Sequence, residues 1–557
     1  MRDPLSMTGS GHSPSLIVEP RGRSIGSWPG RVPPIFDHAG GMAVRAFVTV
    51  LFAPWIVLAG RARQVLLAVV LLDIPLQIDK NFFYLDDAAD FGAIGGFEIS
   101  LTTLALVSLY AGWFVDRNVR GDRTRVPRDL IRPLGAYVGV AALSIIVARD
   151  VGLYSRGLFL LIEMFLVYVY LVGNIRSTED VRFVVKWLLC GLALEGAVII
   201  VLAVTGQSFD FAWVHGRVDE WSDDLVASAR FGGTVGSPNN AAAYFEMLLP
   251  AAAAVLASSF GPSCSALAAL GLALGSPALM ATLSRGGWIA TAVSLTIVCA
   301  ALWWRGRLAG AVPWLAALGL IVALTFHGSI AARLTDDDED SAHSRVPLMA
   351  TAFRIIGDHP VLGVGANNYT AALPDYASRH ENAWLYTVHN QWLLIWAETG
   401  IVGLAAFLWF VIATIRRGVN VWKRSDPLLA PLALGFTAAL VGHTVHMQVD
   451  LFNDRPPLQL LVTVAALIGV MSRMHGAATP QYAVEPIASG APQARPPKRL
   501  AFAPEVLRRV GRSFSGGGSG ALGPRDRTGA PTARIVRRGV GWRGGSAGAK
   551  PTGSEKT

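Results

Sequence analysis

The sequence predicts an all-α polytopic membrane protein with about 12 transmembrane helices, one large loop containing short helices, and disordered ends. Apolar runs of about 18 to 22 residues recur along residues 43–474, and each can cross a ~30 Å hydrocarbon core as a helix. Only 16% of residues are charged and 52% are hydrophobic, whereas soluble domains carry more charge. The alternating segments of ~10 residues that a β-barrel requires are absent from the sequence.

The apolar runs define thirteen candidate spans and an orientation. Basic clusters at 117–128, 176–186, 305–307 and 416–423 fall on one face, which the positive-inside rule makes cytoplasmic. Thirteen spans would leave the basic N-terminus outside, so we prefer twelve, with 43–60 interfacial or re-entrant. The candidate spans are 43–60, 64–79, 95–115, 131–148, 157–174, 183–205, 241–259, 264–283, 287–304, 309–326, 390–414, 428–446 and 457–474.

The two ends differ from the transmembrane domain, which we place at residues 41–474. Residues 1–40 and 475–557 are rich in Gly, Pro, Ser and Arg, a composition that cannot bury a core. The tail holds 14 Lys/Arg against 4 Asp/Glu, a net charge of +10, so with +9 for the whole chain the remainder sums to about −1. We expect a disordered basic cytoplasmic tail that either touches anionic lipid or is a solvated linker.

Two arginines stand out on the outer face. Arg230 begins the segment 230–240, whose Gly and Asn residues lead into a helix N-terminus, a position that favours anions. Arg285 lies in a short outer turn at 284–287, against the charge bias of that face. For the segment 230–240, the structural alternative is an ordinary helix cap. For Arg285, it is an arginine that extends its charged group to the membrane interface without a functional role.

The large outer loop, 326–389, contains three further features. An acidic run at 336–340 lacks the spacing of a Ca²⁺ loop and is interpreted as a solvated face. Residues 345–356, beginning with Arg345, then predict a short helix with an apolar face, and the segment 358–360 breaks it. Gly363 and Gly365 follow, and such a pair is by itself weak evidence for phosphate binding.

The stretch 389–404 follows this loop. His389 and Asn390 precede an apolar helix, which Asn390 can cap. Glu398 lies nine residues further, about 13 Å along a helix axis. It is therefore too deep to pair with His389, and we expect it to pair with a polar group from another helix, because a bare carboxylate in a membrane is costly.

A last polar cluster lies at 443–455. His443 and His446 share one helix face, so metal binding is conceivable, but no third ligand of suitable spacing is evident. Cys190, Cys264 and Cys299 all fall in apolar runs and form neither a disulfide framework nor a metal motif. We therefore expect no metal and no cofactor.

Several of these motifs resemble the O-antigen ligase and polymerase superfamily of bacterial inner membranes. The most specific is His389-Asn390 followed by Glu-x-Gly-x-x-Gly-Leu from Glu398. Residues 358–369, with Gly363 and Gly365, are moderately specific. The segments 238–240 and 284–287 support the resemblance, which spans about residues 225–470.

The resemblance implies a metal-independent glycosyltransferase whose active site faces the periplasm. Its donor would be a glycan on undecaprenyl pyrophosphate, and its acceptor a lipid A core sugar (ligase) or another lipid-linked glycan (polymerase), in lipopolysaccharide or exopolysaccharide synthesis. The sequence does not separate these two. Membrane lipid is the implied surrounding, and no nucleic acid is expected.

The resemblance also implies functional roles for the outer arginines and for His389. Arginine matches phosphate geometry, so Arg285, Arg345 and, more weakly, Arg230 are predicted to bind the pyrophosphate. His389 is predicted to be the general base. Asn390, Glu398, Gly363 and Gly365 are predicted to support the site.

Two other classes of function compete with a transferase. A flippase for lipid-linked glycan would show repeated halves and charges near the midplane, and the sequence has no internal repeat. A membrane anchor whose tail binds a cytoplasmic partner would leave the outer arginines and His389 unexplained.

Overall fold

The computed structural model describes residues 61–118, 126–211, 214–219, 229–306, 327–328, 339–376, 386–424 and 426–477. These residues are mostly helical. The candidate spans 43–60 and 309–326 lie outside the described residues. So do the predicted disordered ends, except that residues 475–477 complete the last helix.

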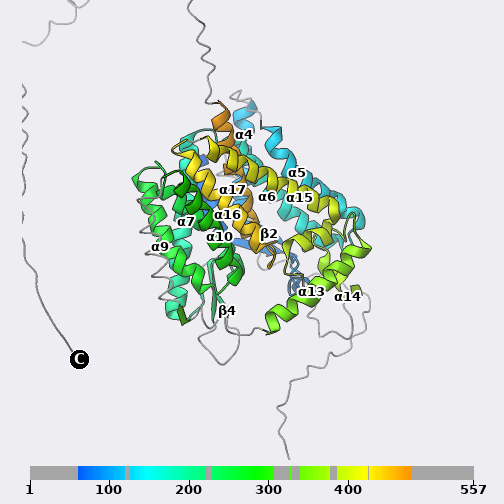
Figure 1. Cartoon of the computed structure of the whole chain (residues 1–557). Helices are drawn as coiled ribbons and strands as arrows, with labels where there is room; N and C mark the ends of the chain where they lie inside the picture. The colour runs from blue at the N-terminus through cyan, green and yellow to red at the C-terminus, as the bar shows by residue number, and fades with distance from the viewer. Residues whose placement is uncertain are drawn as a thin grey trace, which may run out of the picture. The chain divides into compact units, whose positions relative to one another are not determined.

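Long helices form the body of the protein (Figure 1). They are α2 (Ala62–Leu76), α4 (Leu101–Asn118), α5 (Arg128–Leu143), α6 (Val151–Asn174), α7 (Thr178–Thr205), α8 (Pro238–Leu256), α9 (Pro262–Ala281), α10 (Arg285–Trp304), α13 (Glu339–Asp358), α15 (Gln391–Lys423), α16 (Leu429–His446) and α17 (Arg455–Ala477). The short helices are α3 (Asp86–Ala89), η1 (Ser144–Val147) and α14 (Tyr369–Tyr376).

Helix starts follow local capping chemistry. Asp150 accepts a hydrogen bond from the backbone N–H of Leu153 at the start of α6. Ser177 and Asp180 form a capping box at α7. The side chains of Ser237 and Ser284 cap α8 and α10 by accepting from the backbone N–H three residues further on. Each cap satisfies a backbone donor that the first helical turn leaves without a partner.

Helices α8, α16 and α17 are largely buried and form the centre of the bundle. Helix α16 packs against α8, α10 and α15, while α17 packs against α6 and α15. A side chain at Gly435 would meet the backbone of Pro250 and Ala251 at 2.9 Å. The small residue therefore allows α16 to approach α8 closely, as is common in membrane helix packing.

Eight of the described helices are long and apolar enough to cross a membrane. They are the helices at 128–147, 151–174, 178–205, 262–281, 285–304, 391–423, 429–446 and 455–474. Three further predicted spans correspond to α2, α4 and α8. These helices do not meet both the length and the hydropathy required of a membrane span. The multi-pass membrane architecture is supported, and the total of about twelve spans stays a prediction.

Two small antiparallel sheets were missed by the all-α prediction. Strands β1 (Asp79–Phe82) and β2 (Phe97–Ser100) pair as one sheet. Strands β3 (Phe209–Phe211), β4 (Val214–Asp219) and β5 (Arg230–Gly233) form the other. These strands are too short to show a clear alternating pattern.

The first sheet also changes two predicted span boundaries. The span predicted at 64–79 ends at Leu76, because Gln77 adopts a left-handed conformation with φ of 45°. The span predicted at 95–115 begins at Leu101, directly after β2. Strand β4 lies toward the same end of the bundle as α13 and α14, the lower end in Figure 1, whereas β2 lies nearer the middle.

Candidate active site

Helix α15 is broken at Gly400, which has φ of 67° and ψ of −174°. The break interrupts the helical hydrogen-bond pattern, and the segment 360–365 bonds to the backbone there. Val364 donates to the carbonyl of Ala397 at 2.9 Å, and Gly365 donates to that of Glu398 at 2.9 Å. In the opposite direction, the N–H of Ile401 in α15 donates to the carbonyl of Pro360 at 2.9 Å.

Gly363 and Gly400 permit this close approach. A side chain at Gly363 would clash with the backbone of Glu398, and one at Gly400 would clash with the carbonyl of Val361. Both residues also have positive φ, which favours glycine. The Gly-Val-Gly segment thus packs against the break in α15, and this contact explains why the two motif segments occur together.

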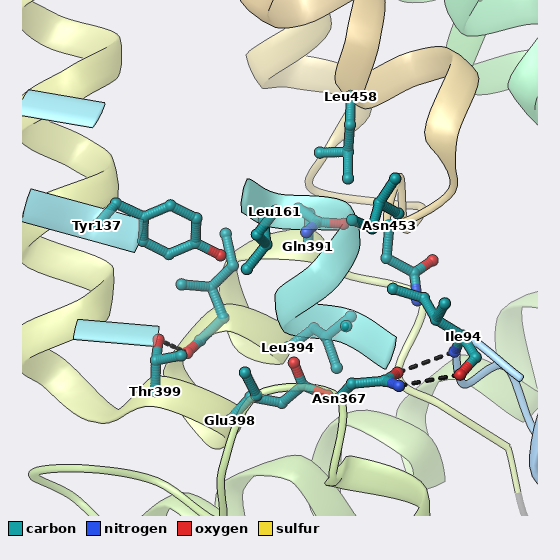
Figure 2. Close-up of a pocket in the computed structure, with 14 residues that line it drawn as sticks. Ile94, Tyr137, Leu161, Asn367, Gln391, Leu394, Glu398, Thr399, Asn453 and Leu458 are labelled. Atoms are coloured by element: carbon teal, nitrogen blue, oxygen red, sulfur yellow. Dashed lines mark hydrogen bonds between the residues drawn. The ribbon is translucent and has the colours of Figure 1, made fainter. Parts of the chain in front are cut away.

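Glu398 lies beside this break and next to a small cavity of about 50 Å³ (Figure 2). Its Oε1 accepts a hydrogen bond of 3.3 Å from the backbone N–H of Tyr369, the first residue of α14. The expected polar partner from another helix is therefore a backbone amide. An acidic group at a helix N-terminus also suits the helix dipole.

Asn367 and Asn368 connect the same loop to the N-terminal half of the protein. Figure 2 shows Asn367 paired with the backbone of Ile94, accepting at 2.8 Å and donating at 3.0 Å. Asn368 accepts from the backbone N–H of Asp150 at 2.7 Å, at the start of α6. The sequence analysis assigned no role to these amides, and their contacts span more than 200 residues, so no local pattern could predict them.

His389 is held between an aromatic ring and a buried carboxylate. Its ring stacks on Tyr386 with centroids 5.3 Å apart and an interplanar angle of 8°. Its Nδ1 lies 3.1 Å from Oδ1 of Asp450, whose side chain is 6% exposed, whereas the His389 side chain is 30% exposed. If Nδ1 donates to Asp450, Nε2 carries the lone pair.

The residues after His389 are clamped to the loop that carries Asp450. Asn390 caps α15 as predicted, accepting from the N–H groups of Trp392 and Leu393. Its amide also donates to the carbonyl of Gln448 at 2.8 Å. The backbone N–H of Gln391 donates to the carbonyls of Met447 and Asp450, so the two segments keep a constant spacing.

Asp450 is negatively charged in this setting. Burial opposes its ionisation, but the hydrogen bond from His389 and the charge of His446 together lower the pKa of Asp450 below its usual range. A carboxylate that stays ionised can orient the imidazole and stabilise it when it is protonated.

A buried glutamate links the two histidines of α16, and the sequence analysis did not identify it. Glu246 of α8 accepts from Nδ1 of His443 and from Nδ1 of His446, each at 2.7 Å, and all three side chains are at most 1% exposed. The two histidines share a face, as predicted. Among the described residues, no group of three or more His, Cys, Asp or Glu side chains is suited to hold a metal ion.

His446 brings two of the predicted arginines into one region. Its Nε2 lies 3.5 Å from Oγ of Ser284, the residue before Arg285, and a side chain at Gly286 would clash with its ring. Arg345 of α13 lies close enough to His446 for their charges to interact. Arg285 and Arg345 are both half-buried.

Arg230 lies near the same turn and is bound from two sides. Its Nε donates to the carbonyl of Thr282 at 3.1 Å, and its guanidinium donates to Oδ1 of Asn239 at 2.7 Å. The structure thus gathers Arg230, Arg285, Arg345 and His389 around the end of α16 and the loop that follows it. The sequence placed them on separate elements.

A second charged cluster surrounds Arg455, the first residue of α17. This fully buried guanidinium pairs with Asp73 at 2.9 Å, with Asp79 at 2.8 Å, and with Glu98. Burial, followed by the neighbouring Glu98, raises the pKa of Asp79 to about 7, although Arg455 opposes this shift.

A cavity of about 250 Å³ opens beside this cluster. It lies between the β1–β2 hairpin, residues 79–100, and the N-terminal ends of α8 and α17. Its lining is mainly polar and consists of Gln77, Asp79, Asn81, Tyr84, Ala93, Ile94, Gly95, Gly96, Glu98, Val235, Gly236, Ser237, Asn240, Asp454 and Arg455.

Comparison with known proteins identifies one family. Residues 270–408 match the family model described as O-Antigen ligase, a stretch that includes Arg285, Arg345, His389 and Glu398. No curated protein matches the chain. The match confirms the predicted resemblance to the O-antigen ligase superfamily over residues 270–408, and it supports a ligase- or polymerase-type role in polysaccharide assembly.

Proposed function

We propose that this chain, which matches the O-antigen ligase family over residues 270–408, transfers or polymerises a glycan from undecaprenyl pyrophosphate onto an acceptor sugar. The reaction would occur at the periplasmic face of the bacterial inner membrane. The observation that carries the proposal is the His389–Asp450 pair, because Asp450 and Arg345 both interact electrostatically with the same neighbour, His446. A base next to cationic groups suits a reaction in which a hydroxyl attacks and a pyrophosphate leaves.

In this proposal His389 is the general base. Nδ1 faces the ionised Asp450, which leaves Nε2 to accept the proton of the acceptor hydroxyl. As the proton moves to Nε2, the hydroxyl oxygen forms a bond to the anomeric carbon. The bond from that carbon to the pyrophosphate oxygen breaks, and its electron pair leaves with the pyrophosphate.

The arginines would bind the pyrophosphate in this proposal. Arg285 follows Ser284, which contacts His446 at the end of α16, and the charge of Arg345 on α13 interacts with the same histidine, so two different elements bring an arginine to this region. Arg230, which already bonds Thr282 and Asn239, would shape the turn that carries Arg285. Guanidinium groups in a partly dry site stabilise the charge of the leaving group without a change in their own protonation.

The test is glycan transfer by membranes that contain the His389→Ala variant, with lipid-linked glycan extracted from the same cells as the donor. Loss of a general base should lower the rate about 10²- to 10⁴-fold. His215→Ala is the matched control, because His215 lies on β4, is exposed and pairs with Asp210. Undiminished transfer by His389→Ala would disprove the base assignment.

Deletion of the gene followed by glycan profiling distinguishes the possible reactions. Products with a single repeat unit would indicate a polymerase, and free lipid-linked polymer would indicate a ligase. Loss of glycan lipid from the outer face would instead indicate a flippase and contradict the proposal.

A further inference from the structure

The 250 Å³ cavity beside Arg455 is formed by segments that are distant in the sequence. The β1–β2 hairpin contributes Asp79, Asn81 and Tyr84, while Asn240 comes from α8 and Asp454 from the loop before α17. Asn240 donates to Oδ2 of Asp454 at 2.6 Å, which closes one side of the cavity. Such convergent polar groups around a preformed hollow are typical of a binding site.

The charges around the cavity select among possible ligands. Three acidic side chains, Asp79, Glu98 and Asp454, line it together with the single cation Arg455, so the excess of acidic groups disfavours a phosphate or another anion. Arg455 compensates Asp79 and Glu98, and the described residues form no group suited to hold a metal ion. With anions and metal ions disfavoured, the lining fits a neutral ligand with many hydroxyl groups. Such a ligand can both donate to the carboxylates and accept from the amides.

The size and the aromatic lining favour a single sugar ring. About 250 Å³ is slightly below the ~300–1,000 Å³ of sites for drug-sized molecules. Tyr84 is 49% exposed at the cavity, and its ring offers an apolar face to the C–H groups of a sugar.

The cavity is connected to the region of His389. The hairpin loop bonds to both segments of the candidate active site: Thr387 donates to the carbonyl of Phe91 at 3.0 Å, and Asn453 donates to that of Gly92 at 3.1 Å. Asp454 is four residues from Asp450, the partner of His389, in the same loop. A glycan bound in the cavity would therefore lie near the proposed base.

We propose that this cavity is a subsite for one neutral sugar unit of the glycan substrates. The inference rests on the proposed glycan transfer, since it specifies where a sugar of the donor or of the acceptor is held. Asn81 and Tyr84 bind the sugar, while Arg455 holds Asp79 and Glu98 in place.

Binding can be measured without catalysis. The full-length protein in lipid nanodiscs is mixed with methyl glycosides of glucose, galactose, mannose and N-acetylglucosamine, and saturation-transfer NMR reports contact. We expect a signal from at least one glycoside, weakened about tenfold in affinity by Asn81→Ala and by Tyr84→Ala. Neither residue takes part in the buried Arg455 cluster, so both variants should fold.

Lys80→Ala is the matched control. Lys80 lies between Asp79 and Asn81 on β1, is exposed, and is not part of the cavity lining, as expected from the alternation of side chains along a strand. The Lys80→Ala variant should bind the glycosides as tightly as the unaltered protein does. Equal binding by all variants, or no signal from any glycoside with the unaltered protein, would overturn the subsite.

His389→Ala separates this inference from the proposed function. That variant should lose transfer and keep sugar binding, whereas Asn81→Ala should raise KM about tenfold with kcat nearly unchanged. A rise in KM for the lipid-linked glycan assigns the sugar to the donor, and a rise for the acceptor assigns it to the acceptor. An unchanged KM for both substrates would contradict the inference.

Discussion

Among single residues, several buried polar side chains form hydrogen bonds with side chains on other elements. His389 faces Asp450, and Glu246 accepts from both His443 and His446. Each pair satisfies a group that would be costly to leave alone in a buried site. The function of a residue such as His389 therefore depends on a partner about 60 positions away in the chain.

Asp450 gives a pH prediction at this scale. Its pKa is lowered in the folded protein, so its ionised form adds stability above the unfolded pKa of about 3.9, and this stability is lost as the pH falls through the folded pKa. Asp450→Asn should lower the unfolding temperature at pH 7, and the difference should shrink below about pH 4. Thermal unfolding of the purified protein in detergent between pH 3 and pH 8 measures this.

Asp87→Asn is the control for that experiment, because Asp87 is exposed on α3. It should leave the unfolding temperature nearly unchanged across the range. A destabilisation by Asp450→Asn that stays constant down to pH 3 would contradict the role of the ionised carboxylate.

At the scale of elements, the broken helix α15 is the feature that organises the candidate site. The break at Gly400 exposes two carbonyls, and the segment 360–365 occupies them. The first part of α15 thereby holds the glycine segment and α14, while its N-terminus presents His389.

Gly400→Ala tests the importance of the break. Alanine at positive φ is strained, and its Cβ would clash with the carbonyl of Val361, so we expect a loss of at least about 1–3 kcal/mol and a marked loss of transfer. Thermal unfolding and glycan transfer are both measured.

Gly139→Ala is the matched control within α5. A Cβ at Gly139 would meet nothing within 4 Å, so alanine should be neutral or should stabilise the helix by about 0.5–1 kcal/mol. Equal behaviour of the two alanine variants would show that the break in α15 is not required.

In the whole molecule, β4, α13 and α14 lie toward one end of a helix bundle (Figure 1). Eight described helices can cross a membrane. The positive-inside rule predicts that the candidate site faces away from the cytoplasm.

Cysteine labelling tests this orientation. In a variant with Cys190, Cys264 and Cys299 replaced by serine, single cysteines are introduced as Lys80→Cys and Arg424→Cys. A maleimide that cannot cross the inner membrane should label position 80 in cells with a permeabilised outer membrane. Position 424 should be labelled only after lysis, and the reverse pattern would contradict the orientation.

Features that depend on local chemistry were predictable from the amino-acid sequence. Hydropathy predicted the long helices, the asparagine at 390 predicted the cap of α15, and short motifs predicted the superfamily. Each of these depends on residues that are close together in the chain. The β1–β2 hairpin and the break at Gly400 were missed, because helix hydropathy does not report a short strand or a single positive φ.

The contacts between charged groups could not be predicted in this way, because they depend on how the helices pack. In the sequence, Glu246 is a single polar residue in an apolar run, and it gains its histidine partner because α8 packs against α16. The cavity beside Arg455 forms only where the hairpin, α8 and α17 come together. These contacts join residues up to 382 positions apart, as between Asp73 and Arg455. The physical reason is that a buried charge needs a partner in space, and the packing of helices, rather than spacing along the chain, selects that partner.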